Sequence, residues 1–188
     1  MSTSVYTLDL GDRLEEIQRL EFQHREVFLP VTGRLVPEEI LQFLSSLGRA
    51  PVVADVATGT GLWLRDLAMK LSPDAQLDGY DLDTAKFLEP SQLPPNVKLM
   101  QGNALEPFPP EKHESYDFVH IRFMLYGLKA HQWDEIAINV QPLLRPGGYL
   151  LWEEAGYPGM TCLPMTESFQ KLMNINVRHA ALMERDIT

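Results

Sequence analysis

The sequence contains a single cysteine, Cys162, among its 188 residues. One cysteine excludes an internal disulfide and a cysteine-based metal site, and we expect its thiol to behave as a small core hydrophobe. No apolar run approaches the roughly 20 residues that a membrane span needs. The N-terminus also lacks the basic and apolar regions of a secretory signal. These absences predict a cytosolic protein.

Basic residues are scarce as well, with 16 Lys and Arg against 26 Asp and Glu and a formal net charge of -10. Such a surface repels phosphate backbones, and no basic patch offsets it, so nucleic acid is not an expected partner. Hydrophobic residues make up 45% of the chain, and its length suits one domain with a real core.

Strand-like and helix-like segments alternate along most of the chain. This order predicts an α/β fold with a parallel sheet that is covered on both faces. Strands are expected at residues 52–57, 76–81, 97–102, 116–121 and 149–153, and helices at 12–29, 37–47, 61–71, 84–89, 131–144 and 165–185.

The most informative stretch is the turn Thr58–Gly61, which joins the first strand to a helix. Ligands of open α/β sheets bind outside the carboxyl ends of the strands, where this turn lies. Its glycines let the backbone approach a ligand, and the helix that follows directs free N–H groups at it. A plain strand-to-helix connection is the alternative.

Two nucleotide-binding classes do not fit this turn. A dinucleotide fingerprint requires glycine at position 64, which is leucine, and a phosphate-binding loop requires a following Gly-Lys-Ser/Thr. The pattern instead places Asp55 inside the strand ahead of Ala57, Gly59 and Gly61. Asp55 could balance the cationic amino-acid end of a ligand.

The next two strands end in polar residues. Asp81 follows Gly61 by 20 residues, at the tip of the second strand, where a carboxylate can accept both hydroxyls of a ribose. The third strand leads into Asn103 and Ala104, which could hold an adenine edge. A solvated acid is the alternative for Asp81.

Together these stretches resemble the class I S-adenosylmethionine-dependent methyltransferases, and more narrowly the fungal secondary-metabolism group. The matching segments are VVADVATGTG, GYDLD, QGNALEPFP, YDFVHIR and LLRPGGYLLWEE, in this order over roughly residues 50–155, with RLEFQH near the N-terminus. That fungal group includes small-molecule methylating enzymes and a regulator of metabolite clusters.

The resemblance implies a doubly wound, Rossmann-like, mostly parallel sheet and S-adenosylmethionine as cofactor. It divides the chain into a helical lid (1–49), a cofactor-binding core (50–156) and a cap helix (157–188). Ala57 replaces the usual first glycine, which should be tolerated, and Asn103 replaces the commoner aspartate, which should alter the contact to the adenine amino group without abolishing it. The resemblance also implies which residues contact the cofactor. The methionine moiety would be contacted by Asp55, Ala57, Thr58, Gly59 and Gly61, and the ribose by Asp81. The adenine would be contacted by Leu82, Asn103 and Ala104, while His120 and Arg122 would lie between cofactor and acceptor.

The sheet of this family has seven strands, whereas this sequence predicts five. The strand at 149–153 would then leave an open apolar edge, which needs a cover. The chain could be a fragment, a partner of another chain, or a degenerate relative that still binds cofactor. We expect a homo- or hetero-oligomer in which a second chain covers the edge.

His120 is the first candidate for a general base, because it lies at the ligand end of a strand and titrates near neutrality. The alternative is a histidine that orders the cofactor pocket without proton transfer. His24 fits a buried core histidine or a lid residue, and His131 a helix start. Glu153 and Glu154 could contact an acceptor amine or be solvated. No metal site is expected.

Three functions fit this sequence. One is methyl transfer to oxygen, nitrogen or sulfur of a small-molecule secondary metabolite. Another is a cofactor-dependent rearrangement or cyclisation, and the third is a regulatory or interaction role without catalysis. The intact cofactor turn favours an enzyme, and the acceptor is not specified by any motif.

Overall fold

The computed structural model describes residues 13–156 and 163–187, so Cys162 lies outside the described residues. Its centre is a five-stranded sheet with the order β3-β2-β1-β4-β5, in which all paired strands are parallel. The predicted α/β class is confirmed. The strands are β1 Val52–Val56, β2 Gln76–Asp81, β3 Val97–Gln101, β4 Tyr116–Arg122 and β5 Leu144–Glu153.

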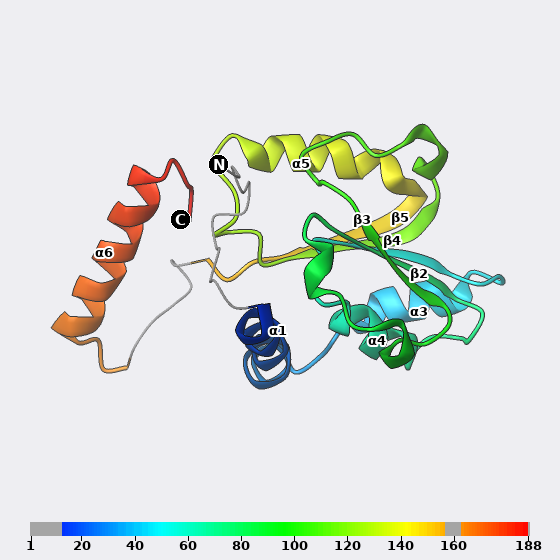
Figure 1. Ribbon diagram of the computed structural model, residues 1–188, viewed down its shortest axis with the longest axis horizontal. Helices are drawn as coiled ribbons and strands as arrows, with labels where there is room; N and C mark the ends of the chain where they lie inside the picture. Colours follow the sequence, from blue (N-terminus) through cyan, green and yellow to red (C-terminus); the bar gives the residue numbers. More distant parts are fainter. Residues whose placement is uncertain (1–12, 157–162, 188) are drawn as a thin grey trace.

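Helices cover both faces of the sheet, as predicted (Figure 1). The helices α3 (Glu38–Ser46) and α4 (Leu62–Ala68) lie on one face, and α5 (Gln132–Val140) lies on the other. Trp63 and Phe118 belong to the first core, while Ile121 and Ile136 belong to the second. Because both faces are covered, the central strands β1 and β4 are buried along nearly their whole length rather than at alternate residues.

The N-terminal helix is continuous but changes its winding. It begins as α1 (Arg13–Phe22), widens into a π-helical segment (Gln23–Phe28) and ends as α2 (Leu29–Thr32). Pro30 accounts for the widening, because its ring clashes with the carbonyl four residues earlier in a regular α-helix. The Leu29 N–H accordingly donates to the carbonyl of His24, five residues back.

Some predicted bounds differ from the structure. The helix expected at 131–144 ends at Val140, and a 3-10 turn (Gln141–Leu143) follows because Pro142 cannot continue the helix. β5 therefore begins at Leu144 rather than at residue 149. The helix expected at 84–89 is a single 3-10 turn, Thr84–Lys86.

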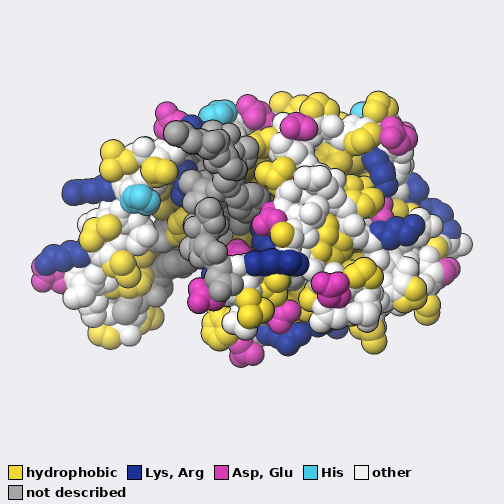
Figure 2. Space-filling view, in the orientation of Figure 1, with side chains coloured by type: hydrophobic (Ala, Val, Ile, Leu, Met, Phe, Trp, Pro, Cys, Tyr) yellow, Lys and Arg dark blue, Asp and Glu magenta, His cyan; other side chains and the backbone are white. Residues whose placement is uncertain are grey.

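The last helix, α6 (Glu167–Leu182), stands apart from the sheet (Figure 1). Among the described residues, Ala180 near the end of α6 and Ile187 beyond it form a small apolar cluster with Leu125. Leu172 and Ile175 are 54% and 64% exposed. Hydrophobic side chains accordingly lie at the surface of this helix in Figure 2. In the described part of the chain, no helix is long and apolar enough to cross a membrane.

The register of the strands places specific polar residues next to each other. Asp55 of β1 pairs with His120 of β4, and Arg122 of β4 pairs with Glu153 of β5. The strand order reverses between β1 and β4, and such a reversal is where open α/β sheets bind ligands.

Candidate functional site

A cavity of about 370 Å³ lies at the carboxyl ends of the strands. Its walls come from the turn after β1, the tips of β2 and β4, the segments after β3 and β5, and the N-terminal helix. Gly61 does not line the cavity, although it shapes the turn. Ten of the residues predicted from the sequence line it: Asp55, Ala57, Thr58, Gly59, Asp81, Leu82, Asn103, Ala104, His120 and Arg122.

The turn after β1 adopts left-handed backbone at three positions. Gly59 has φ 61° and Gly61 φ 84°, values that glycine adopts at little cost. A Cβ on Gly61 would also lie 2.6 Å from Leu99 Cδ1, so a larger residue would be strained and would require the Leu99 side chain to shift. Ala57 has φ 59° as well, and an alanine in this conformation is strained.

Asp81 fastens this turn to the tip of β2. Its Oδ2 accepts a hydrogen bond from Gly59 N at 2.8 Å, and its Oδ1 accepts one from Asp83 N at 3.0 Å. Burial raises the pKa of Asp81, against the opposing effects of Lys86 and of these backbone donors. Each carboxylate oxygen can accept a further hydrogen bond, so Asp81 is able to bind ligand hydroxyls from the cavity wall.

Asn103 lies beyond β3, where the sequence places it, but its amide group is engaged locally. Its Oδ1 accepts from Leu105 N at 3.1 Å and its Nδ2 donates to Glu106 Oε1 at 3.0 Å. The side chain therefore shapes the segment after β3.

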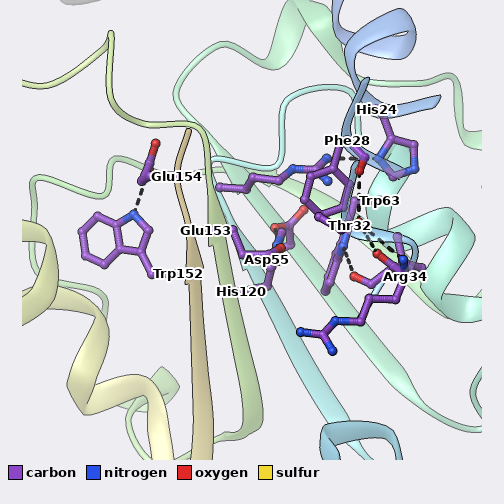
Figure 3. Close-up of polar contacts among 12 residues, drawn as sticks. His24, Phe28, Thr32, Arg34, Asp55, Trp63, His120, Trp152, Glu153 and Glu154 are labelled. Carbon is purple, nitrogen blue, oxygen red and sulfur yellow. Dashed lines mark hydrogen bonds and ion pairs between the residues drawn. The ribbon is translucent and has the colours of Figure 1, made fainter. Parts of the chain in front are cut away.

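His120 is bonded through both ring nitrogens. Nδ1 lies 2.7 Å from Asp55 Oδ1, and Nε2 lies 3.3 Å from Glu153 Oε2 (Figure 3). The other oxygen of Asp55 accepts from Thr58 Oγ1 at 2.6 Å. Both oxygens of Asp55 thus accept hydrogen bonds from protein groups, and Asp55 also lines the cavity. These contacts favour the alternative in which His120 orders the pocket, because a role as base requires Nε2 to leave Glu153.

A second polar group joins the N-terminal helix to β4. His24 is 2% exposed; its Nε2 lies 3.1 Å from Asp66 Oδ2, and its Nδ1 lies 3.1 Å from Arg122 Nη2. His24 is therefore a buried histidine that also lines the cavity. Burial lowers the pKa of Arg122, although Asp55 and Glu153 act against this shift.

Glu154 holds the segment after β4 in place. Its Oε1 accepts from Trp152 Nε1 at 2.9 Å (Figure 3). Oε1 also accepts from Met124 N at 2.8 Å, and Oε2 accepts from Leu125 N at 3.1 Å. Burial raises the pKa of Glu154, while these donors lower it. Glu154 thus supports the cavity wall and is not a solvated acid.

Sequence reasoning missed several wall residues. Trp63 stacks on His120, Lys86 is 5% exposed beside Asp81, and the segment 123–128 lines one side of the cavity. The position of segment 123–128, directly after the carboxyl end of a strand, could have predicted that it lines the ligand site. His131 lies at the start of α5 and Glu153 contacts His120, and neither lines the cavity.

A family model described as a methyltransferase domain matches residues 53–148. The chain belongs to the methyltransferase-domain family. The resemblance seen in the sequence is therefore confirmed, and the match extends from β1 into β5.

The methyltransferase domain is also similar to curated fungal proteins. It is 36% identical over 158 residues to methyltransferase grgD of a Penicillium species, covering 80% of this chain and 52% of grgD. It is 31% identical over 137 residues to N-methyltransferase tcpN of Claviceps purpurea, covering 72% and 47%. The secondary metabolism regulator laeA of Gibberella zeae is 29% identical, with 71% and 39% covered. The chain spans about half the length of the first two of these relatives.

Among solved structures, the plantazolicin methyltransferase BpumL in complex with SAH has the same fold as this methyltransferase domain. The TM-score is 0.60 at 16% identity, and the alignment covers 79% of this chain and 56% of BpumL. The cavity at the strand ends is the site that this fold offers to a ligand.

Proposed function

We propose that this methyltransferase domain binds S-adenosylmethionine and takes part in methyl transfer to a small-molecule secondary metabolite. The observation that carries the proposal is Asp81, a buried carboxylate at the tip of β2 that lines the cavity and fastens the Gly59 turn. A cavity of about 370 Å³ also lies in the range of small-molecule and cofactor sites.

The residues around Asp81 fit such a cofactor. Asp81 would accept both ribose hydroxyls, while Leu82 and Ala104 would pack against the adenine. Ala57 and Gly59 leave room for the methionine part beside the turn. When bound, S-adenosylmethionine would supply the methyl group.

The chain itself would position the acceptor and remove a proton where an oxygen, nitrogen or sulfur acceptor carries one. We propose that His120 accepts this proton at Nε2. The contact of Nε2 with Glu153, at 3.3 Å, is longer than the contact of Nδ1 with Asp55, at 2.7 Å, so Nε2 is the nitrogen that could leave its protein partner for the acceptor. Val27, Leu125 and Leu128 line the cavity and suit an acceptor with an apolar body.

We also propose that a second chain covers the edge of the sheet. Tyr149 and Leu150 of the edge strand β5 are 41% and 39% exposed, and the exposed apolar residues of α6 add to this surface. Covering about 400 Å² of apolar surface contributes roughly 10 kcal/mol before the costs of association.

A regulatory role is the second candidate, and the similarity to laeA favours it. The engagement of both His120 nitrogens agrees with a pocket that binds cofactor without proton transfer.

Calorimetric titration of the chain with S-adenosylmethionine and with its demethylated product, S-adenosylhomocysteine, tests the proposal. Both should bind saturably at one site. If neither binds at millimolar concentration, with or without a co-purifying chain, the cofactor assignment is wrong. Binding without methyl transfer to any tested metabolite would favour the regulatory candidate.

A further inference from the structure

The last helix, α6, carries an apolar stripe that the described residues leave exposed. Leu172, Ile175 and Leu182 are 54%, 64% and 82% exposed. They lie three and seven residues apart, a spacing that places them on one narrow face of the helix and suits packing against another helix. An isolated helix of this length, 16 residues, is only marginally stable in water, so α6 needs a packing partner.

The last turn of α6 is fixed away from the N-terminal helix of its own chain. Ala180 and Ile187 cluster with Leu125, and Ala130 N donates to the carbonyl of Glu184 at 2.8 Å. In Figure 1, α6 accordingly stands apart from α1. The stripe cannot reach α1 of the same chain unless these contacts break.

A second exposed apolar face lies on the N-terminal helix. Phe22 of α1, Val27 of the π-helical segment and Val31 of α2 are 61%, 45% and 81% exposed. They follow one another at five and four residues, and the wider π-helical turn brings Val27 close to the side that carries Phe22. The chain therefore presents two helical apolar faces that need a cover.

The two faces are complementary in charge. Lys171 lies four residues before Ile175 and Arg178 three residues after it, so both flank the stripe of α6. Glu15 and Glu26 lie seven residues before and four residues after position 22 on the N-terminal helix. All four charged side chains are exposed, and in the described part of the chain Arg178, Glu15 and Glu26 form no ion pair.

We propose that the chain forms a two-fold dimer in which α6 of each copy packs its stripe on the exposed face of the N-terminal helix of the other copy. The exchange is reciprocal, so two identical contacts close the dimer. This inference rests on the proposed second chain and deepens it, because it names the partner as a second copy and the covering element as α6.

The contact would place the partner at the edge of the cavity. Leu20, His24 and Val27 of the N-terminal helix line the cavity, and Val27 also belongs to the exposed face. A helix packed on this face braces the cavity wall from outside. Each cavity would then be completed only in the dimer.

Sedimentation equilibrium of the whole chain tests the pairing with Phe22→Glu and Ile175→Glu as separate variants. Each variant places a charge in both contacts, so its dimer affinity should fall at least about tenfold. Mixing the two variants should restore the dimer. The mixed dimer has one unaltered contact, between α6 of the Phe22→Glu chain and the N-terminal helix of the Ile175→Glu chain. Its other contact, already opened by one charge, loses little more from the second.

The controls alter the net charge by the same amount on other faces of the same helices. Arg25→Gln and Asn174→Glu change exposed residues and should leave the dimer intact. If a glutamate variant unfolds, Phe22→Gln or Ile175→Gln takes its place.

A monomeric wild type would overturn the inference, and so would dimeric Phe22→Glu and Ile175→Glu variants. Loss of the dimer in Ile175→Glu alone, without rescue on mixing, would mean that α6 packs on a different surface and would overturn it too. Calorimetry with S-adenosylhomocysteine is a separate measurement, so cofactor binding by any of these species would leave the assignment of the cavity standing.

Discussion

The indole of Trp63 lies flat on the imidazole of His120, with 3.8 Å between the ring centroids and 6° between the ring planes. Trp63 belongs to α4, which begins directly after the Gly61 turn. The same imidazole bonds Asp55 of β1 and Glu153 of β5. His120 therefore joins the cofactor turn, α4 and the tips of two strands at one buried point.

Replacing His120 with phenylalanine should keep the stacking on Trp63 but leave buried Asp55 without its hydrogen bond to His120. We expect a loss of about 3 kcal/mol in the free energy of unfolding, as for a buried charged group that loses a hydrogen-bond partner. Urea denaturation measures it. His131→Phe, at an exposed site, should change stability by no more than about 0.5 kcal/mol. Equal stabilities of the two variants would show that His120 does not hold the site together.

Ala57→Gly should stabilise the protein by roughly 1 kcal/mol, because Ala57 has φ 59° and glycine adopts this conformation without strain. Ala54→Gly is the control, since Ala54 is fully buried in β1 and has no positive φ. That change should instead destabilise by about 1 kcal/mol. Thermal or urea unfolding compares them, and destabilisation by both would refute strain at Ala57.

Lys86→Met should make cofactor binding more sensitive to acid. Burial raises the pKa of Asp81 and Lys86 opposes this rise, so removing Lys86 raises the pKa further. The ionised carboxylate is the form proposed to bind ribose, so affinity falls as pH falls through this pKa. S-adenosylhomocysteine affinity, measured as a function of pH, should therefore decline at higher pH in the variant. Lys98→Met, at an exposed position on β3, should leave the profile unchanged.

The chain should not be a lone monomer at micromolar concentration. Static light scattering should give at least the mass of a dimer, and Ile175→Glu on the exposed face of α6 should reduce it. Ile175 is 64% exposed, so the charge should not disturb the fold. Asn174→Glu, at the neighbouring exposed position, should have no such effect. A soluble monomer with cooperative unfolding would contradict the proposed cover.

Much of the fold could be predicted because its signals are local. The bounds of β2 agree with the prediction at both ends, since an apolar segment there runs between a turn and the acidic tip Asp81. The turn at Gly59 and Gly61 could also be predicted from the sequence, because both positions have a positive φ that favours glycine.

The remaining features depend on contacts between distant segments. The second contact of His120 arises from the pairing of β4 with β5, which places Glu153 next to it. His24 turns toward Arg122 from a π-helical segment, although 98 residues separate the two in sequence. Local patterns carry no information on either contact.

Calorimetric titration of Asp81→Ala with S-adenosylmethionine tests the central claim most directly. Hydrogen bonds to a charged group contribute roughly 1.5–3 kcal/mol each, and 1.4 kcal/mol is a factor of ten in affinity. Asp81→Ala should therefore weaken binding at least tenfold. Asp83→Ala, which removes a neighbouring acid that does not line the cavity, should leave binding within about twofold of the wild type. Unchanged affinity in Asp81→Ala, with the wild type binding normally, would show that the ribose is not held at the tip of β2.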